Sequence, residues 1–477
     1  MRILVEGGYP LKKKKKKSQR GMEFQRTFMF FVTLCILVCL TAVFGYTWVH
    51  YINIGIVWAF FRRGNILLVG LYFVLQYIFS RIYGALQIDV YKVSDIVYSQ
   101  GLTTFIVDFI MYFIMSLVAR KMVAVYPVFI MFLVQMGIIL LWSYVAAYGY
   151  KRLYPPRDVV VIYSYHSATN LVWKMSVRDD QFHICEAISI DQDMDYIKKR
   201  IDRYDGAIIC DISGSIRNDI LKYCYDHNKL TYVVPKISDI IIRSGENIHL
   251  FDTPLLRCRN AGLTFERRFF KRFMDILLCL IALAGVGWLM AIVALLIKLE
   301  DGGPVFYKQD RVTKDGKVFQ IIKFRSMIVN AEADGKAHPA VTDDERITKV
   351  GRVIRATRFD EMPQILNILK GDMSIVGPRP ERVENVEAYT RDIPEFKYRL
   401  KVKAGLTGYA QIYGKYNTTA YDKLKLDLFY IENYSIRTDL QLIFMTVKVL
   451  FMKESTEGFD KQIKGINEKT ANGKPED

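Results

Sequence analysis

The chain has 477 residues, of which 51% are hydrophobic and 13% aromatic, and it carries a formal net charge of +17. That length allows about three domains of ~150 residues each, and the apolar fraction excludes a wholly disordered chain. The 30 glycines and 13 prolines are too few for a collagen-like or mucin-like chain. The seven cysteines have neither zinc-site nor disulfide-framework spacing, so we expect reduced thiols in a cytoplasm-facing protein.

Four long apolar runs follow the N-terminus. Residues 27–49, 64–80 and 122–150 contain no formally charged residue, and residues 96–119 contain only Asp108. About 20 apolar residues cross the ~30 Å hydrocarbon core of a bilayer as a helix, whereas a core helix of a soluble protein carries a polar stripe. The sequence therefore predicts a bundle of four transmembrane helices, with Asp108 packed inside it rather than marking a transport path.

The basic residues of the short loops predict the orientation. One side has a six-lysine run at 12–17 together with Arg20, Arg26, Arg81, Lys92, Lys151, Arg152 and Arg157. The other side has only Arg62, Arg63, Arg120 and Lys121. The more basic side is cytoplasmic by the positive-inside rule, which makes residues 1–26 a basic cytoplasmic N-terminus. Its lysines are expected to lie on anionic lipid rather than on nucleic acid.

Met22 reads naturally as a second start, which would make residues 1–21 a leader. No small-residue cleavage site follows the first apolar run, so we do not expect a signal peptide.

Residues 155–260 are predicted to form a small parallel α/β domain in the cytoplasm. Short apolar segments alternate there with polar helical ones. The expected strands are 159–163, 184–190, 206–210 and 230–234, with a helix at 218–227. The turn after the first strand, residues 164–168, has no glycine, so the backbone could not closely approach a pyrophosphate. We expect a Rossmann-like packing or regulatory domain, in which His166 and His183 lack metal-ligand spacing.

A fifth apolar run, residues 276–297, has basic flanks at both ends. They are Arg267, Arg268, Lys271 and Arg272 before it, and Lys298, Lys308, Arg311, Lys314, Lys317, Lys323 and Arg325 after it. Both flanks favour the cytoplasmic side. We therefore predict a re-entrant helix that bends at Gly285-Val286-Gly287, with a fifth span as the alternative that the length allows.

Charged residues cluster again after residue 350. Arg352, Arg355 and Arg358 recur at every third position and precede the adjacent acids Asp360 and Glu361. A proline at 363 and a glycine at 371 bound a short predicted helix, which places the acids at its N-terminus, where carboxylates are stabilised and phosphate is attracted.

This pattern suits phosphoryl transfer. One acid can attack phosphorus, the second can hold Mg²⁺, and the arginines can neutralise the charge that is transferred. An isolated Asp-Glu pair is more simply a helix cap with surface ion pairs, so the pattern alone leaves both interpretations open.

The surrounding motifs resemble the bacterial polyprenyl-phosphate sugar-1-phosphate transferases, the monotopic phosphoglycosyl transferases of capsule, exopolysaccharide and O-antigen synthesis. The resemblance covers about residues 265 to 452, and the preceding segments resemble the large form of the family. The motifs are GPVF (303–306), QDRV (309–312), KFRSM (323–327), RFDEMPQ (358–364), GDMSIVGPRP (371–380), KAGLTG (403–408) and DLFY (427–430).

The resemblance implies a reaction and a set of residues. An α+β catalytic domain over residues 265–453, anchored by the re-entrant helix, would move a sugar-1-phosphate from a UDP-sugar to undecaprenyl phosphate and release UMP. Asp360 matches the nucleophile, and Glu361 matches the acid that helps to hold Mg²⁺, so both are candidate metal ligands. The positions that match phosphate-binding or other active-site residues are Arg355, Arg379, Lys323, Arg325, Arg358, Asp427 and Tyr430.

The implied location is the bacterial inner membrane, with the catalytic domain on the cytoplasmic face. Membrane lipids are implied partners, nucleic acid is not, and a homodimer stays open. The chain departs from the family pattern twice. Gly287-Trp288 stands where the membrane helix commonly bends at Ser-Pro, and Thr313 stands where a glycine is usual. The sugar is not readable, and residues 454–477 are expected to be a disordered polar tail.

Two other functions compete with the transferase. The first is a non-catalytic membrane scaffold or regulator of polysaccharide assembly. The second is an inverting glycosyltransferase, which would need a nucleotide-binding α/β fold. The middle domain does not match such a fold, because the turn after its first strand has no glycine. The nucleotide released separates the three, since UMP, none and UDP are expected from the transferase, the scaffold and the glycosyltransferase respectively.

Overall fold

The structure is a computed structural model that describes residues 20–55, 62–164, 171–172, 175, 181–258, 262–329, 344–414 and 418–450. The chain divides into two units, Met1–Pro235 and Lys236–Asp477. The lysine run at 12–17, the glycine-free turn after residue 164 with its His166, and the tail at 454–477 lie outside the described residues.

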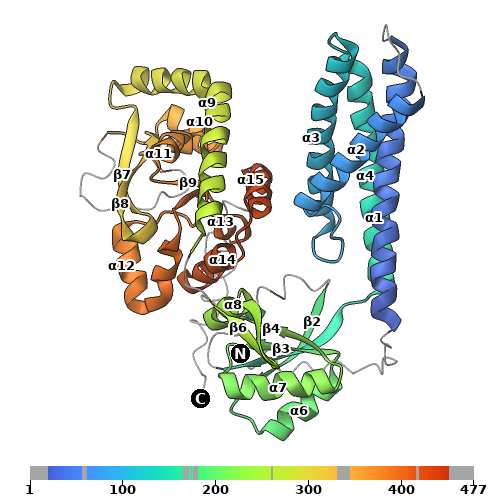
Figure 1. Ribbon diagram of the computed structural model, residues 1–477, viewed down its shortest axis with the longest axis vertical. Coiled ribbons are helices and arrows are strands. Elements are labelled where there is room, and N and C mark those ends of the chain that lie inside the picture. The colour runs from blue at the N-terminus through green and yellow to red at the C-terminus, as the bar shows by residue number, and fades with distance from the viewer. Residues whose placement is uncertain are drawn as a thin grey trace, which may run out of the picture. The chain divides into compact units, whose positions relative to one another are not determined.

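The first unit begins with four long helices, α1 (Arg20–Thr47), α2 (Arg62–Ile82), α3 (Val93–Ala119) and α4 (Val125–Leu153). A π-turn, Trp48–Ile52, and a 3-10 turn, Asn53–Gly55, extend α1. Helix α1 packs against α2 and α4, and α3 packs against the same two helices (Figure 1). Each is long and apolar enough to cross a membrane, which agrees with the four predicted runs.

Polar side chains fill part of the interior of these four helices. The hydroxyl of Tyr72 donates to Asp108 at 3.1 Å, and Gln135 Nε2 donates to the Tyr72 oxygen at 2.9 Å. Gln76 and Thr104 form another interhelical hydrogen bond, 3.0 Å long. Asp108 is buried, as predicted. Such bonds satisfy polar groups that would be costly to leave unpaired in hydrocarbon.

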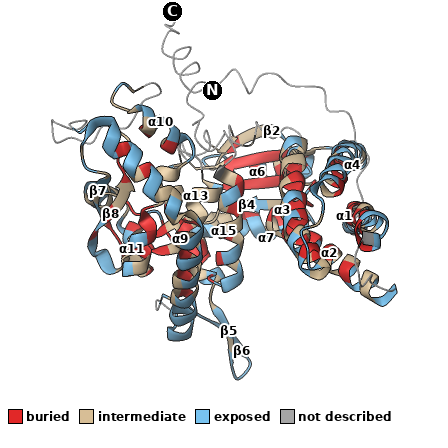
Figure 2. Cartoon of the chain, turned by 90° about the horizontal axis from the view of Figure 1, so that it is seen from above, coloured by how far each residue is buried: buried red, intermediate tan, exposed pale blue. Residues whose placement is uncertain are grey.

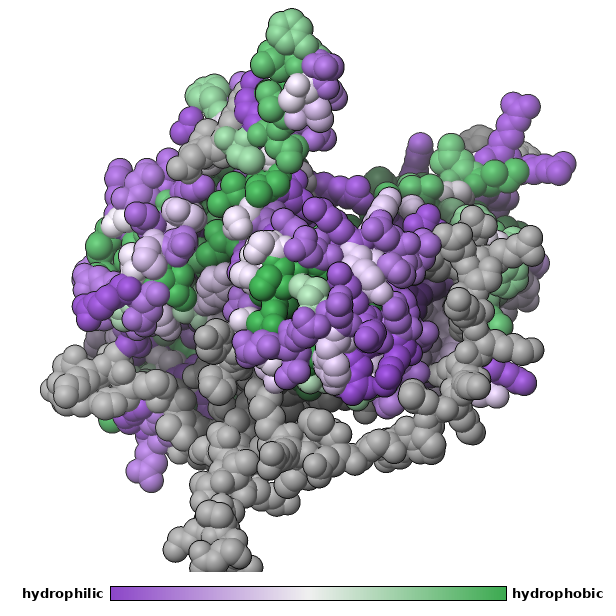
Figure 3. Space-filling view, turned by 90° about the horizontal axis from the view of Figure 1, so that it is seen from below, coloured by the Kyte–Doolittle hydropathy of each residue, from purple (hydrophilic) through white to green (hydrophobic). Residues whose placement is uncertain are grey.

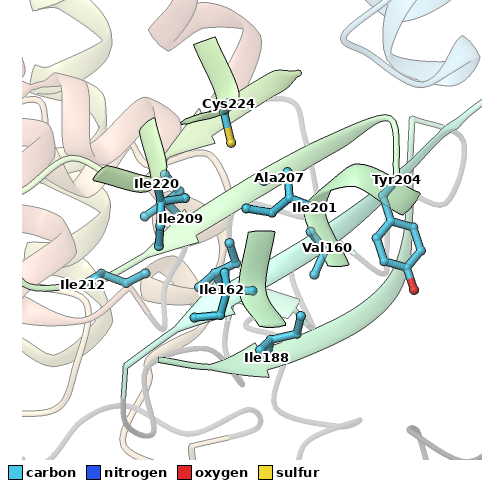
Figure 4. Packing of buried hydrophobic residues seen from close by; sticks show 11 residues of the cluster. Val160, Ile162, Ile188, Ile201, Tyr204, Ala207, Ile209, Ile212, Ile220 and Cys224 are labelled. Atoms are coloured by element: carbon cyan, nitrogen blue, oxygen red, sulfur yellow. The ribbon is translucent and has the colours of Figure 1, made fainter. Parts of the chain in front are cut away.

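A four-stranded parallel sheet follows in the same unit. Its strands β1 (Arg157–Tyr163), β2 (Phe182–Ser189), β3 (Gly206–Cys210) and β4 (Leu230–Val233) lie in the order β2-β1-β3-β4. Helices α6 (Met194–Arg203) and α7 (Gly214–Asp226) cover one face, where Ile201 and Ile220 pack against Val160 and Ile209 (Figure 4).

The four predicted strands, their parallel arrangement and the predicted helix within α7 are confirmed. Buried residues run along the central strands β1 and β3, whereas the outer strands β2 and β4 are mostly of intermediate burial (Figure 2). The side of the molecule shown in Figure 3, where α6 and α7 lie, is mostly hydrophilic.

The second unit starts with α8 and an exposed hairpin, and continues into the C-terminal domain. Its elements are α8 (Ile237–Arg243), β5 (Glu246–Leu250), β6 (Thr253–Arg257), α9 (Phe265–Asp301), β7 (Phe306–Val312), β8 (Val318–Phe324), α10 (Lys349–Ala356), α11 (Gln364–Lys370), β9 (Ser374–Val376), α12 (Val383–Asp392), β10 (Gly405–Thr407), α13 (Tyr409–Tyr413), α14 (Ala420–Glu432) and α15 (Ile436–Leu450). Segment 237–243 packs against α14, although the sequence pattern places it in the middle domain.

Helix α9 is apolar enough to cross a membrane and consists of two arms that meet at a sharp bend in Figure 1. The indole N–H of Trp288 donates to the carbonyl of Gly285 at 2.8 Å. This contact lies at the glycine pair where the bend was predicted, and no proline is present there.

Both arms of α9 are fixed to the C-terminal domain. On the first arm Arg272 donates to the carbonyls of Ile368 and Leu369 at 2.6 and 2.7 Å. On the second arm Glu300 accepts the backbone N–H of Lys349 at 2.7 Å, at the start of α10. The apolar face of α9 joins two small cores of the same domain, one containing Cys279 and the other containing Val293 and Ile297.

Two short parallel strands, β9 and β10, pair with each other and hold the loops attached to them. Gly377 and Gly405 allow their backbones to touch, because a Cβ on Gly405 would lie 2.1 Å from the Gly377 nitrogen. Thr313 has an extended backbone with φ −122°, so this turn does not require the usual glycine. Its hydroxyl instead donates to Asp372 O at 2.9 Å and accepts from Ala404 N at 3.1 Å.

Candidate active site

Asp360 and Glu361 lie in a one-turn 3-10 helix, Phe359–Glu361, between α10 and α11. Arg358 precedes it with φ 54°, a left-handed conformation that ends the helical path of α10. The prediction that the acids begin the short helix is therefore wrong by one turn, since α11 begins at Gln364. Its predicted end is confirmed by Gly371, which has φ 100°.

Basic side chains from separate elements surround Glu361. Lys323, at the end of β8, places its Nζ 2.5 Å from Glu361 Oε1. Arg379, in the loop after β9, places Nη2 3.5 Å from the same oxygen. Glu361 and Lys323 are about one-fifth exposed, whereas Arg379 is nearly half exposed. The structure thus unites residues that lie up to 56 positions apart in the sequence.

The two acids have opposite pKa shifts. Burial raises the pKa of Asp360, and the neighbouring Glu361 charge adds to this effect, while Lys323 and Arg355 oppose it. Burial also acts to raise the pKa of Glu361, but Lys323 and then Arg379 outweigh it and lower that pKa to about 2. Glu361 is therefore a fixed negative charge, and Asp360 is the more basic and hence more nucleophilic carboxylate.

The remaining predicted arginines take different positions. Arg358 adds to the positive charge that acts on Glu361, and Arg355 does the same for Asp360. Arg325 is buried and pairs with Asp301 at the end of α9. Gly303 packs directly over its guanidinium, where a Cβ would lie 1.8 Å from Nη1. Arg325 thus supports the second arm of α9 and is not brought to the acid pair.

Asp427 is also not among the described residues that contact Asp360 or Glu361. It is 1% exposed, and its carboxylate pairs with Arg399 at 2.8 Å. Arg399 Nη2 donates to the backbone carbonyl of Arg379 at 2.9 Å, and its Nη1 lies 3.8 Å from Glu381. Asp427 therefore acts on the candidate site through Arg399, by holding the loop that carries Arg379.

Tyr430 has a similar supporting position. It is 2% exposed, and its hydroxyl donates to Asp439 at 2.7 Å and lies 3.2 Å from Val376 O, in the strand that leads into the Arg379 loop. Lys271 Nζ, on the first arm of α9, reaches Asp439 at 2.7 Å and the Tyr430 hydroxyl at 3.1 Å. This buried network connects α9 to β9 and to the loop that carries Arg379.

Sequence reasoning missed Arg399 and Asp439, which are separate from the recognised motifs, and interpreted Lys271 and Arg272 only as part of a membrane flank. Basic residues before an apolar run are typical of a membrane flank, but the Lys271 side chain is only 9% exposed, in an ion pair. The sequence did contain one signal for a structural role of Lys271, because it lies four positions before the acidic Asp275 and on the same helical face. Asp275 is itself buried and accepts from Ser374 Oγ at 3.1 Å.

The donor atoms of the acid pair fit Mg²⁺. Carboxylate oxygens are the hard ligands that this ion prefers, although Lys323 already contacts one oxygen of Glu361. Among the described residues no third acid, histidine or cysteine joins Asp360 and Glu361 in a ligand group. An Mg²⁺ ion here would therefore depend on water and on substrate phosphate for its other ligands.

These features define an α+β membrane protein whose C-terminal domain holds two adjacent acids among basic side chains, beside an apolar helix. The family model described as "Bacterial sugar transferase" matches residues 266–453. One relative, from Caulobacter vibrioides, is named UDP-glucose:undecaprenyl-phosphate glucose-1-phosphate transferase. It is 37% identical over 190 residues, which are 39% of this chain and 71% of that protein. The chain belongs to the bacterial sugar transferase family.

Two further relatives show how far the likeness extends. An uncharacterized sugar transferase of Bacillus subtilis strain 168 is 36% identical over 187 residues, covering 39% of this chain and 90% of that protein. A UDP-N-acetylgalactosamine-undecaprenyl-phosphate N-acetylgalactosaminephosphotransferase of Aeromonas hydrophila is 45% identical over 185 residues, covering 38% of this chain. That match spans 44% of the length of the Aeromonas protein.

Proposed function

We propose that this protein transfers a sugar-1-phosphate from a UDP-sugar to undecaprenyl phosphate, releasing UMP and forming undecaprenyl-diphosphate-sugar. The observation that carries the proposal is the difference in pKa between the two adjacent acids. Glu361 is held by Lys323 at 2.5 Å, and Asp360 stays the more basic acid. A helix cap would need neither this separation of pKa values nor the convergence of three chain segments. The names of the relatives support the same reaction class.

In the first step, an Asp360 carboxylate oxygen attacks the β-phosphorus of the UDP-sugar. The bond between that phosphorus and the oxygen bridging to the α-phosphate breaks, and UMP leaves with the electron pair. The phosphosugar is then esterified to Asp360. Arg379, nearly half exposed beside Glu361, is placed to bind the phosphate charge that moves during this step.

In the second step, an oxygen of undecaprenyl phosphate attacks the same phosphorus and the Asp360 carboxylate leaves. The acceptor is a lipid, so the site must lie near headgroups. The attachment of both arms of α9 to one domain supports a re-entrant rather than a spanning helix, because Cys279 and Ile297 both pack on that domain. A re-entrant helix with basic residues at both ends would keep the acid pair on the cytoplasmic face, beside the membrane.

Mg²⁺ bound by Asp360 and Glu361 would supply positive charge to the phosphate oxygens of the donor. Because Lys323 and Arg379 already provide two cationic groups next to Glu361, the chain itself contributes much of the electrostatic stabilisation.

The test is transfer of radiolabelled sugar from a panel of UDP-sugars to undecaprenyl phosphate, with full-length protein in nanodiscs and Mg²⁺. UMP release with labelled lipid is expected for wild type and for Asp315→Asn, an exposed control on the β7–β8 turn. Both products should be lost in Asp360→Asn. Folded protein that is inactive with every donor would favour the scaffold alternative, UDP release would favour a glycosyltransferase, and activity in Asp360→Asn would exclude it as the nucleophile.

A further inference from the structure

Three potential metal ligands meet on the first unit, far in sequence from the acid pair. They are Asp158 at the start of β1, and His183 and Cys185 near the start of β2. Asp158 Oδ1 lies 3.0 Å from His183 Nδ1, and Cys185 Sγ lies 3.5 Å from the same nitrogen. All three ligand atoms lie within 4.8 Å of one another. The sequence spacing around His183 does not reveal this group, because Asp158 comes from the neighbouring strand.

The register of the sheet brings these side chains together. Asp158 and His183 are directly paired across β1 and β2, so their side chains lie on the same face. The register shifts between Val159 and Val160, which face Ile184 and Glu186, and Cys185 is the extra residue on β2. A bulge of this kind re-aims a side chain. Here it accompanies the approach of Cys185 to the His183–Asp158 pair.

Hydrogen bonds already link these three residues. His183 Nδ1 can donate to Asp158 at 3.0 Å, and the Cys185 thiol can donate to the backbone carbonyl of His183 at 3.5 Å. The three potential ligand atoms nevertheless converge within 4.8 Å, which is close enough for one cation to contact all of them.

The donor types suit zinc, and the sulfur–nitrogen distance matches a zinc site, whereas the oxygen–nitrogen distance is that of a hydrogen bond. Tetrahedral Zn²⁺ with ordinary bond lengths separates a carboxylate oxygen from an imidazole nitrogen by about 3.4 Å, and a thiolate sulfur from that nitrogen by about 3.6 Å. The structure has 3.0 and 3.5 Å. A thiolate with an imidazole favours Zn²⁺ over Mg²⁺ or Ca²⁺.

We propose that Asp158, His183 and Cys185 form a zinc-binding site on the α/β domain, with solvent in the fourth ligand position. Asp205 adds a second carboxylate beside the site, since its Oδ2 accepts the backbone N–H of Asp158 at 3.2 Å.

The site lies close to where the α/β domain contacts the membrane helices. Gln181, two residues before His183, donates to the carbonyl of Asp89 in the α2–α3 loop. The backbone N–H of Arg157, next to Asp158, donates to the carbonyl of Gln181 at 3.3 Å. Zinc would join the starts of β1 and β2 at this contact and stabilise the junction within the first unit.

The first test uses Co²⁺ as a spectroscopic substitute for zinc, with full-length protein in detergent. We expect one Co²⁺ per chain with a thiolate-to-metal charge-transfer band that stoichiometric Zn²⁺ abolishes. Cys185→Ser should lose the band, and His183→Ala should weaken Co²⁺ binding at least tenfold. The matched controls Cys258→Ser and His227→Ala remove an exposed thiol and an exposed imidazole elsewhere, and both should behave as wild type.

The second test measures the structural consequence. Zinc should slow hydrogen exchange in residues 157–163 and 182–189 of wild-type protein and of the controls, but not of Cys185→Ser. Zinc should also protect Cys185 from alkylation, as mapped by mass spectrometry. Absence of the thiolate band in folded wild type, its persistence in Cys185→Ser, or its loss in the Cys258→Ser control would each overturn the proposal.

Discussion

Replacing Asp427 by asparagine is expected to destabilise the C-terminal unit and to reduce catalysis through Arg399. The ion pair is almost dry, with Arg399 2% and Asp427 1% exposed. Breaking a buried pair by removing one partner costs about 3–5 kcal/mol. Glu381, 3.8 Å from the Arg399 guanidinium, keeps part of the charge paired, so we expect the lower limit of about 3 kcal/mol. For a unit of this size that loss corresponds to a melting temperature lower by about 6–12 °C.

The assay is thermal unfolding of full-length protein in detergent, followed by tryptophan fluorescence, with kcat and KM measured below the transition. Asp315→Asn is the control, because it removes an acid from an exposed ion pair and asparagine tolerates the same positive φ. A melting temperature for Asp427→Asn within 2 °C of the control, a margin of about 1 kcal/mol, would refute the reasoning. Replacing Arg399 by methionine together with Asp427 by leucine should recover part of the stability, since both charges of the pair are then absent and Lys423 stays 3.5 Å from the buried Glu381.

Three further predictions concern pH, topology and close packing. In the proposed reaction Asp360 must be ionised to attack, so kcat/KM should fall as pH drops through its raised pKa. Arg355→Met should move this acidic limb to higher pH, because it removes a charge that lowers that pKa. Single cysteines at Arg268 and Lys317, in a chain without other cysteines, should both react with a membrane-impermeant maleimide in inside-out vesicles only. Gly405→Ala should lower the yield of folded protein sharply, because its Cβ would lie 2.1 Å from a backbone nitrogen.

Each of these predictions has a matched control or a contrary outcome. Arg352→Met removes an exposed arginine from the same helix and should leave the acidic limb in place. Labelling of one engineered cysteine from the opposite side of the membrane would establish a spanning α9. Gly214→Ala adds a methyl group where nothing lies within 4 Å, and equal damage from this change would mean that close approach is not the cause.

The sequence predicted those features that depend on local pattern. Uninterrupted apolar runs identified the five long helices, and alternation of apolar and polar segments identified the parallel sheet. Motif resemblance identified Glu361, Lys323 and Arg379. The structure brings the Lys323 Nζ and Arg379 Nη2 atoms within 3.5 Å of the same Glu361 oxygen, Oε1.

The features that the sequence did not predict depend on contacts between distant segments. Arg399 lies outside the recognised motifs, and its role follows only from its contact with Asp427, 28 positions away. The buried ion pair of Lys271 with Asp439 was not predicted, because a buried cation and a membrane-flanking cation look alike in sequence. The Asp158–His183 contact depends on strand register, which a hydrophobic pattern with period two restricts but does not determine when the strands are far apart in sequence.

The attachment of both arms of α9 to one domain has a consequence for how the protein responds to its lipid environment. A helix that crosses a bilayer must match the hydrocarbon thickness, and it tilts or deforms the bilayer when it does not. Helices α1–α4 are subject to that constraint if they span. A re-entrant α9, held through Arg272 at one end and Glu300 at the other, enters and leaves through the same leaflet. The depth of the acid pair is then set by the protein alone, so sugar transfer should change little between short-chain and long-chain lipids.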